Sequence, residues 1–191
     1  MNSENVLKFN TGNTSKRDIA KLFNPKKHTW NIVANYGDLE MMKWMHTNNI
    51  KGCTNNAMDI AAESGHLEMV KWLHANRTEG CTTDAMDYAA GRGLLEMVKW
   101  LHANRKEGCT TGAMDSAAGN GDLKMVKWLH ANRTEGCSKD AMARACYNGY
   151  FEVVKWLHDN GKPYGAKRAI ETALNNNHKN IAKWLLKIYL S

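Results

Sequence analysis

The amino-acid sequence predicts an all-α protein built as a solenoid of stacked helix-turn-helix units. The tetrapeptide Lys-Trp-Leu-His recurs at 71–74, 99–102, 127–130 and 155–158, with variants at 43–46 and 183–186, and successive copies lie 28 residues apart. A strict period in this range is typical of a solenoid. Hydrophobic residues make up 43% of the chain and only two residues are proline, which favours a folded, helix-rich protein.

The period divides the chain into three segments. Residues 29–191 contain six units of 28 residues, and the last unit is predicted to act as a C-terminal cap. Residues 14–28 precede the period and carry Ile19, Leu22 and Phe23 at a helical spacing, which predicts an N-terminal capping helix. Residues 1–13 begin with a polar stretch, and we expect a mobile tail there.

The first helix of each unit is predicted to pack closely against its neighbours. In the unit at 84–104, Asp84 is the predicted N-cap, and Asp87 places a carboxylate in the first turn, where it favours the helix dipole. Small side chains on one face then allow another helix to approach closely. That face consists of Ala85, Met86, Ala89 and Ala90, and equivalent N-caps are predicted at Asn56, Gly112 and Asp140.

The first helix is predicted to end at Gly93 with a positive φ, because glycine has no Cβ to oppose a left-handed backbone. Gly37, Gly65, Gly121, Gly149 and, in the last unit, Asn177 occupy the same position. A second helix follows, with an apolar band wide enough to contact the units on both sides. This band consists of Leu95, Met97, Val98, Trp100 and Leu101.

The stretch Ala-Ala-x-x-Gly-His-Leu-Glu-Met-Val-Lys at 61–71, together with its copies, resembles the ankyrin repeat over roughly residues 29–190. Two features differ from the family: Asx-Ala-Met-Asp replaces the usual Thr-Pro-Leu-His start, and the period is 28 residues where the ankyrin repeat has about 33. The missing residues map to the connection at 104–111, so the β-hairpin fingers of the family are predicted to be shortened or absent. Arrays with this Lys-Trp-Leu-His helix resemble those of protists and large DNA viruses.

The resemblance implies a scaffold that binds a protein partner through the concave face of the first helices. Comparison of the units supports this face: the second helices are nearly invariant, whereas the first helices vary at 88, 91, 92 and the equivalent positions, which share one face. Tyrosine and arginine, which often anchor protein interfaces, occur there. Neutral drift on an exposed face would produce the same variation. The predicted partner-binding residues are Tyr36, Ile60, Ser64, Tyr88, Arg92, Ser116, Asn120, Arg144, Tyr147 and Asn148.

Cysteine, histidine and tryptophan also recur with the period. Equivalent positions on stacked helices lie about 8–10 Å apart, too far for a disulfide or a shared zinc ion. We therefore expect reduced, packed cysteines, tryptophans that pack between units, and no metal site. The histidines are predicted to bond a backbone group or an aspartate. The three sets are the Cys ladder (Cys53, Cys81, Cys109, Cys137), the His ladder (His46, His74, His102, His130, His158) and the Trp ladder (Trp44, Trp72, Trp100, Trp128, Trp156, Trp184), and the aspartates are Asp59, Asp87 and Asp115.

The net charge of +7 is concentrated at the two ends of the chain. Residues 1–28 have six basic and two acidic residues, residues 166–191 have five and one, and the segment between them has fifteen and sixteen. A nucleic-acid binder should have a continuous basic stripe, so this distribution argues against nucleic acid. A binder of nucleic acid or of an acidic surface that uses the basic ends remains the alternative.

No catalytic motif is present, such as a phosphate-binding glycine loop or a nucleophile elbow. We therefore expect no enzyme activity and no cofactor. No apolar run is long enough to span a bilayer. We expect an unsecreted monomer of the cytoplasm, and the sequence does not exclude the nucleus.

Overall fold

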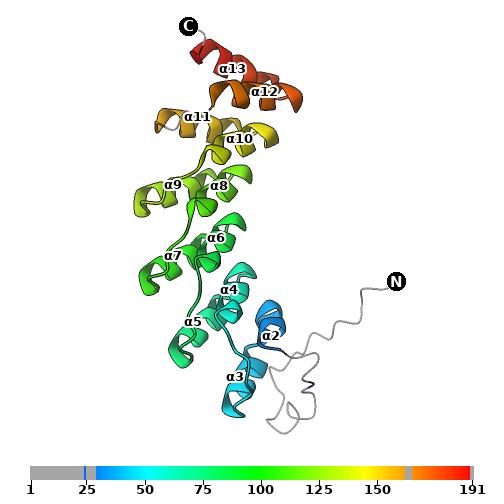
Figure 1. Cartoon of the computed structure of the whole chain (residues 1–191), viewed down its shortest axis with the longest axis vertical. Coiled ribbons are helices and arrows are strands. Elements are labelled where there is room, and N and C mark those ends of the chain that lie inside the picture. The colour runs from blue at the N-terminus through cyan, green and yellow to red at the C-terminus, as the bar shows by residue number, and fades with distance from the viewer. Residues whose placement is uncertain (1–23, 25–28, 162–164, 190–191) are drawn as a thin grey trace, which may run out of the picture. The chain divides into compact units, whose positions relative to one another are not determined.

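The computed structural model describes residues 24, 29–161 and 165–189. Over these residues it contains twelve α-helices and no strand, which confirms the predicted all-α class. The tail predicted at 1–13 and the capping helix predicted at 14–28 lie outside the described residues, except for Asn24. The chain divides into two compact units, Met1–Ala85 and Met86–Ser191, and each is a stack of helix pairs (Figure 1).

Successive helix pairs follow one another along the chain. The first unit has α2 (Trp30–Tyr36), α3 (Leu39–Thr47), α4 (Asn56–Glu63) and α5 (Leu67–Asn76). Helix α6 (Asp84–Gly91) spans the division between the units. The second unit continues with α7 (Leu95–Asn104), α8 (Thr111–Gly119), α9 (Leu123–Asn132), α10 (Lys139–Asn148), α11 (Phe151–Asp159), α12 (Ala166–Asn175) and α13 (Lys179–Tyr189). Within a unit the first helices of neighbouring pairs pack together, as α2 does on α4 and α8 on α10.

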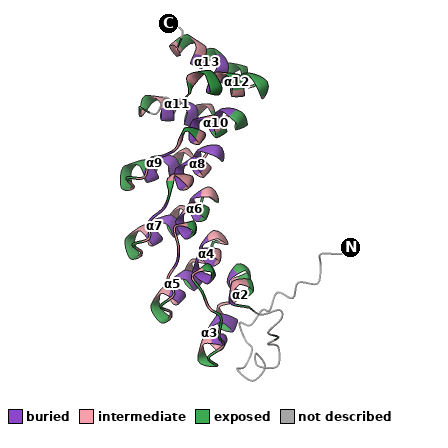
Figure 2. Ribbon diagram, viewed as in Figure 1, coloured by how far each residue is buried: buried purple, intermediate pink, exposed green. Residues whose placement is uncertain are grey.

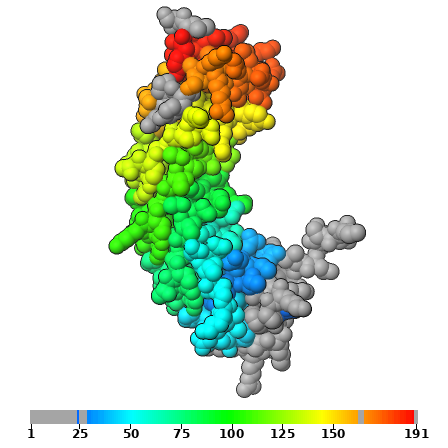
Figure 3. Space-filling view, viewed as in Figure 1, coloured from blue at the N-terminus to red at the C-terminus, as the bar shows by residue number. Residues whose placement is uncertain are grey.

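The core of each unit lies between the paired helices (Figure 2). The small-residue face of the first helix is buried as predicted, and Ala89 and Ala90 are fully buried. In the apolar band of the second helix, Met97, Val98 and Leu101 are buried, and Leu95 and Trp100 are half-buried. In the second unit consecutive helix pairs lie directly against one another in the space-filling view (Figure 3).

The predicted N-caps are wrong by one or two residues. Helices α4 and α6 begin at Asn56 and Asp84 themselves, and Gly112 and Asp140 are already the second residues of α8 and α10. The capping groups are hydroxyls two residues earlier. Thr110 and Ser138 have extended backbones, and their side chains accept hydrogen bonds from the N–H groups of Gly112 and Asp140 at 2.9 and 3.0 Å.

The predicted ends of the first helices are confirmed. Gly149, for example, has φ of 80°, and the following Tyr150 donates its backbone N–H to the carbonyl of Ala145. Asn177 has φ of 63° at the same point in the last pair. The chain can therefore reverse direction tightly between the two helices of a pair. The residues with positive φ at this point are Gly37, Gly65, Gly93, Gly121, Gly149 and Asn177.

The connections between pairs contain no β-hairpin in the described residues. Arg105–Thr110, for instance, joins α7 to α8 without a strand. The prediction of shortened or absent fingers is therefore confirmed, and the first helices are left as the variable surface of each unit.

Candidate protein-interaction surface

The variable positions of the first helices form exposed surface in both units. Tyr36 is 53% exposed in the first unit, and Tyr88 and Tyr147 are 49% and 58% exposed in the second. A tyrosine left half exposed offers a large apolar ring together with a polar hydroxyl, a combination common at protein interfaces. Of the other predicted residues, Arg92, Asn120, Arg144 and Asn148 are exposed, and Ile60, Ser64 and Ser116 are half-buried.

Three of the predicted binding residues also hold neighbouring first helices together. The Asn148 Nδ2 atom donates to the carbonyl oxygen of Gly119 at 2.8 Å, and Asn120 Nδ2 donates to the carbonyl of Gly91 at 2.5 Å. In the first unit, Ser64 Oγ lies 3.3 Å from Asn35 Oδ1. Part of the sequence variation at these positions therefore serves contacts between repeats.

The structure brings four of the predicted residues together around one hollow. This hollow has a volume of about 300 Å³, and it lies between α8 and α10 in the second unit. Ser116, Gly119, Asn120, Arg144 and Asn148 line it. The other predicted residues of that unit, Tyr88, Arg92 and Tyr147, are not part of its lining as described.

The aspartate in the first turn of one repeat clamps the capping hydroxyl of the next. Asp115 is only 6% exposed, and it accepts from the backbone N–H of Ser138 at 2.8 Å and from its hydroxyl at 2.6 Å. Asp87 binds Thr110, and Asp59 binds Thr82, in the same way. These carboxylates thus stabilise contacts between repeats and are not available to the histidines.

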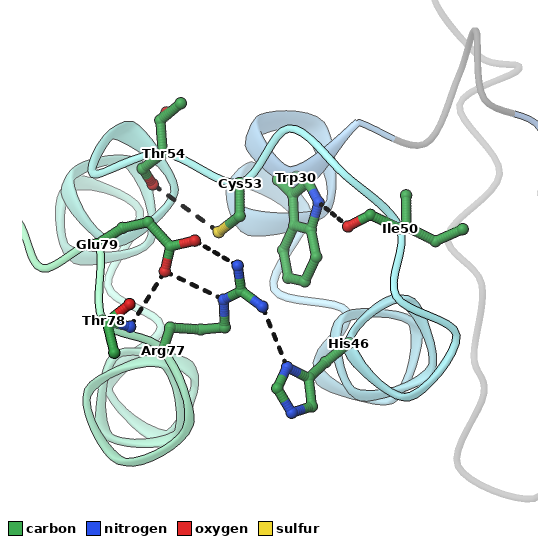
Figure 4. A network of polar contacts seen from close by, with 8 residues as sticks. All are labelled: Trp30, His46, Ile50, Cys53, Thr54, Arg77, Thr78 and Glu79. Atoms are coloured by element: carbon green, nitrogen blue, oxygen red, sulfur yellow. Dashed lines mark hydrogen bonds and ion pairs between the residues drawn. The ribbon is translucent and has the colours of Figure 1, made fainter.

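The histidines have a different partner from the one predicted. In the first unit, Arg77 Nη1 lies 3.3 Å from His46 Nδ1, and the same guanidinium forms an ion pair with Glu79 (Figure 4). It also lies over the ring of Trp30, 5.0 Å from the centroid. Arg133 repeats this contact with His102 in the second unit. The predicted bond to aspartate or backbone is wrong for His46 and His102, because the Nδ1 atom of each faces the arginine that follows the second helix of the next repeat.

The Trp ladder packs between repeats, as predicted. Each of its six indoles is half-buried. His46 lies edge-on to Trp72 with ring centroids 5.4 Å apart, and His130 lies edge-on to Trp156 at 5.0 Å. His102 and His158 contact Trp128 and Trp184 in the same way. Within each unit, these histidines and tryptophans therefore form part of the interface between second helices.

The cysteines are packing residues with free thiols. Cys81, Cys109, Cys137 and Cys146 are buried, and Cys53 is half-buried. Burial raises the pKa of the Cys109 thiol to about 11 and that of Cys146 to about 12. Thiols held protonated in this way are poor nucleophiles and poor metal ligands. No group of three or more potential metal ligands occurs among the described residues.

Sequence reasoning overlooked one repeated feature, the ion pair within each connection. Arg105 pairs with Glu107, and Arg133 pairs with Glu135, as Arg77 does with Glu79. The signal was present in the repeated Arg-x-Glu-Gly at 77–80, 105–108 and 133–136. The paired side chains are about one quarter exposed. Each pair lies within the connection that follows α5, α7 or α9 and joins two residues of that connection.

Two family models of ankyrin repeats match the sequence. A model of ankyrin repeats in many copies matches residues 32–74, 58–102 and 86–130, and a model of three ankyrin repeats matches residues 113–190. No curated protein is similar enough to the chain to count as a match. No helix in the described part of the chain has the length and apolar character needed to cross a membrane. The matches cover most of the sequence, and the chain belongs to the ankyrin repeat family.

Proposed function

We propose that this chain is a non-catalytic scaffold that binds a protein partner through the variable face of its first helices. Ankyrin repeats are in general modules for protein–protein interaction. The observation that carries the choice of face is the exposure of Tyr36, Tyr88 and Tyr147, three large rings at positions that differ between repeats. A partner that covered them would bury apolar area that the free protein leaves in water.

The backbone beneath this face supports its use as a preformed surface. The bonds from Asn120 and Asn148 tie α8 to α6 and α10 to α8. The clamps at Asp87 and Asp115 hold the starts of the same helices. A surface ordered before binding loses less conformational entropy when the partner arrives.

The proposal is tested by affinity capture followed by binding measurements. Wild-type chain and the variant Tyr88→Ala with Arg144→Ala serve as baits, and the captured partner is then purified and titrated by calorimetry. We expect the double variant to weaken binding by at least about tenfold. The matched control, Glu96→Ala with Lys99→Ala, removes an exposed ion pair from α7 of the same unit and should bind like wild type.

Salt dependence separates this function from the alternative that uses the basic ends. Lys179, Lys183 and Lys187 are exposed along α13, and a binder of nucleic acid or an acidic surface would depend on such charges. A steep loss of affinity with added salt, unchanged by the Tyr88 and Arg144 substitutions but abolished by glutamate at the three lysines, would overturn the proposal. The proposal is supported if affinity depends only weakly on salt and the variant Tyr88→Ala with Arg144→Ala binds the partner less tightly.

A further inference from the structure

The side chain of Arg144 is held in place by a glycine on the neighbouring helix. A Cβ atom added at Gly119 would lie 3.1 Å from Arg144 Cβ and 3.3 Å from its Cδ. The aliphatic stem of the arginine therefore rests on the α8 backbone, where only glycine leaves room for it. Arg144 also lines the hollow, together with Ser116, Gly119, Asn120 and Asn148.

The guanidinium has no partner within the protein as described. Neither a hydrogen bond nor an ion pair to Arg144 occurs within residues 24, 29–161 and 165–189. The carboxylates on the two helices of the hollow are both engaged elsewhere: Asp115 is buried and bound to Ser138, and Asp140 lies 3.7 Å from Arg168. The hollow therefore contains one uncompensated positive charge.

The remaining lining groups favour an anion. Asn120 and Asn148 each use one amide N–H for a backbone carbonyl, so each retains a second N–H donor. Ser116 adds a hydroxyl. A carboxylate accepts two parallel hydrogen bonds from a guanidinium, and its single charge balances one arginine, whereas a phosphate dianion would require a second cation.

The variable positions of the first helices around the hollow contain no competing negative charge. No acidic residue occurs among these positions in α6, α8 and α10, which are Tyr88, Gly91, Arg92, Ser116, Gly119, Asn120, Arg144, Tyr147 and Asn148. Arg92 already has a contact within the protein, so the site depends on Arg144 alone. Tyr147 is 58% exposed beside Asn148 and supplies an apolar surface for the residues that flank an anionic side chain.

We propose that the hollow between α8 and α10 binds an aspartate or glutamate side chain of an acidic peptide segment, with Arg144 as the residue that grips the carboxylate. This inference rests on the proposed function, because it assigns a peptide chemistry to part of the same surface. It adds a specific requirement: the segment must present a carboxylate to one arginine, held in position by Gly119.

The test selects short random peptides from a displayed library on the full chain and measures the affinity of the selected peptides by fluorescence anisotropy. We expect the peptides to share an aspartate or glutamate. Arg144→Gln should weaken their binding by about tenfold or more, and changing the shared acid to its amide should have little further effect in that variant. Lys124→Gln, which removes one exposed positive charge from α9 of the same unit, is the matched control and should change little.

A second variant separates positioning from charge. Gly119→Ala keeps the arginine, but its Cβ would lie 3.1 Å from Arg144 Cβ, so the Arg144 stem and α10 must shift. We expect weaker peptide binding, and the thermal midpoint of the same variant measures how much stability the shift costs. Selected peptides without acidic residues that respond to Tyr88→Ala, but not to Arg144→Gln, would overturn the carboxylate site and leave the proposed function standing. Failure to select any peptide sensitive to the first helices would count against both, and stronger competition by a single-stranded oligonucleotide than by the acidic peptide would also overturn the site.

Discussion

Arg77 donates a hydrogen bond from Nη1 to Nδ1 of His46, across 31 residues of sequence and 3.3 Å of space. A guanidinium has only donors, so the imidazole nitrogen that faces it must be the acceptor. Arg133 and His102 have the same relationship in the second unit. The contact couples the connection of one repeat to the second helix of the repeat before it.

This geometry determines the tautomer of His46. We expect the neutral ring to have its proton on Nε2, and long-range ¹⁵N–¹H correlation spectra of the full chain at neutral pH should show Nδ1 at the shift of an unprotonated nitrogen. Arg77→Met removes the donor and should allow the two tautomers to mix. A protonated Nδ1 in the wild-type protein would contradict the assignment.

The ion pair of Arg133 predicts a loss of stability in acid. The hydrogen bond from Arg133 holds the pKa of Glu135 below its ordinary value of 4.5. A depressed folded-state pKa gives stability that is present above the unfolded-state pKa and is lost as the pH falls through the folded one. Urea denaturation at pH 7 should show wild type to be more stable than Glu135→Gln, and the difference should shrink below pH 4.5. A difference that does not change with pH would contradict this account.

The buried clamp at Asp115 predicts a large effect from one carboxylate. Asp115→Ala removes two hydrogen bonds to Ser138, and bonds to a buried charged acceptor contribute about 1.5–3 kcal/mol. We expect the free energy of unfolding in urea to fall by about 3 kcal/mol. Asp159→Ala is the control, since Asp159 is exposed at the end of α11, and its effect should stay within about 0.5 kcal/mol. Equal effects would show that the clamp contributes nothing.

Two glycines with positive φ separate backbone strain from side-chain displacement. Gly108 has φ of 75°, and a Cβ there would lie 2.5 Å from Nη2 of Arg133. Gly52 has φ of 93° and no atom within 4 Å of such a Cβ. Alanine at Gly52 should cost about 1 kcal/mol from strain alone, and alanine at Gly108 about 1 kcal/mol more because it pushes Arg133 away from its partners. The comparison uses thermal or urea midpoints, and equal losses would exclude the second contribution.

Thiol reactivity should follow burial. The pKa of Cys146 is raised to about 12 from an ordinary 9.0 by desolvation, so its thiolate fraction at neutral pH is about a thousandfold below that of a free cysteine. Cys53 is only half-buried. Desolvation and the charge of Glu79 raise the pKa of its thiol as well. Pulsed iodoacetamide labelling with peptide mass spectrometry should modify Cys53 first and Cys146 last, and the order should vanish in urea. Early modification of Cys146 in the native protein would contradict its burial.

Several features follow from the sequence because they depend on short-range physics that repeats with the period. Positive φ at Gly149 and Asn177, the buried face at Ala89 and Ala90, and the absence of fingers in connections such as Arg105–Thr110 each concern one unit and its copies. The exposure of Tyr88 and Tyr147 follows in the same way, since residues three positions apart share a helix face.

Contacts between side chains of successive repeats were decided only by the tertiary structure. The period predicts that His46 needs a partner, but the choice of Arg77 over Asp59 depends on the path of the connection and on how far one repeat is shifted from the next. The same holds for Arg144, which a helical wheel places on the surface without showing that Gly119 of another helix supports its stem. Periodicity specifies which residues are equivalent, whereas the distance between unlike residues of neighbouring repeats is set by packing in three dimensions.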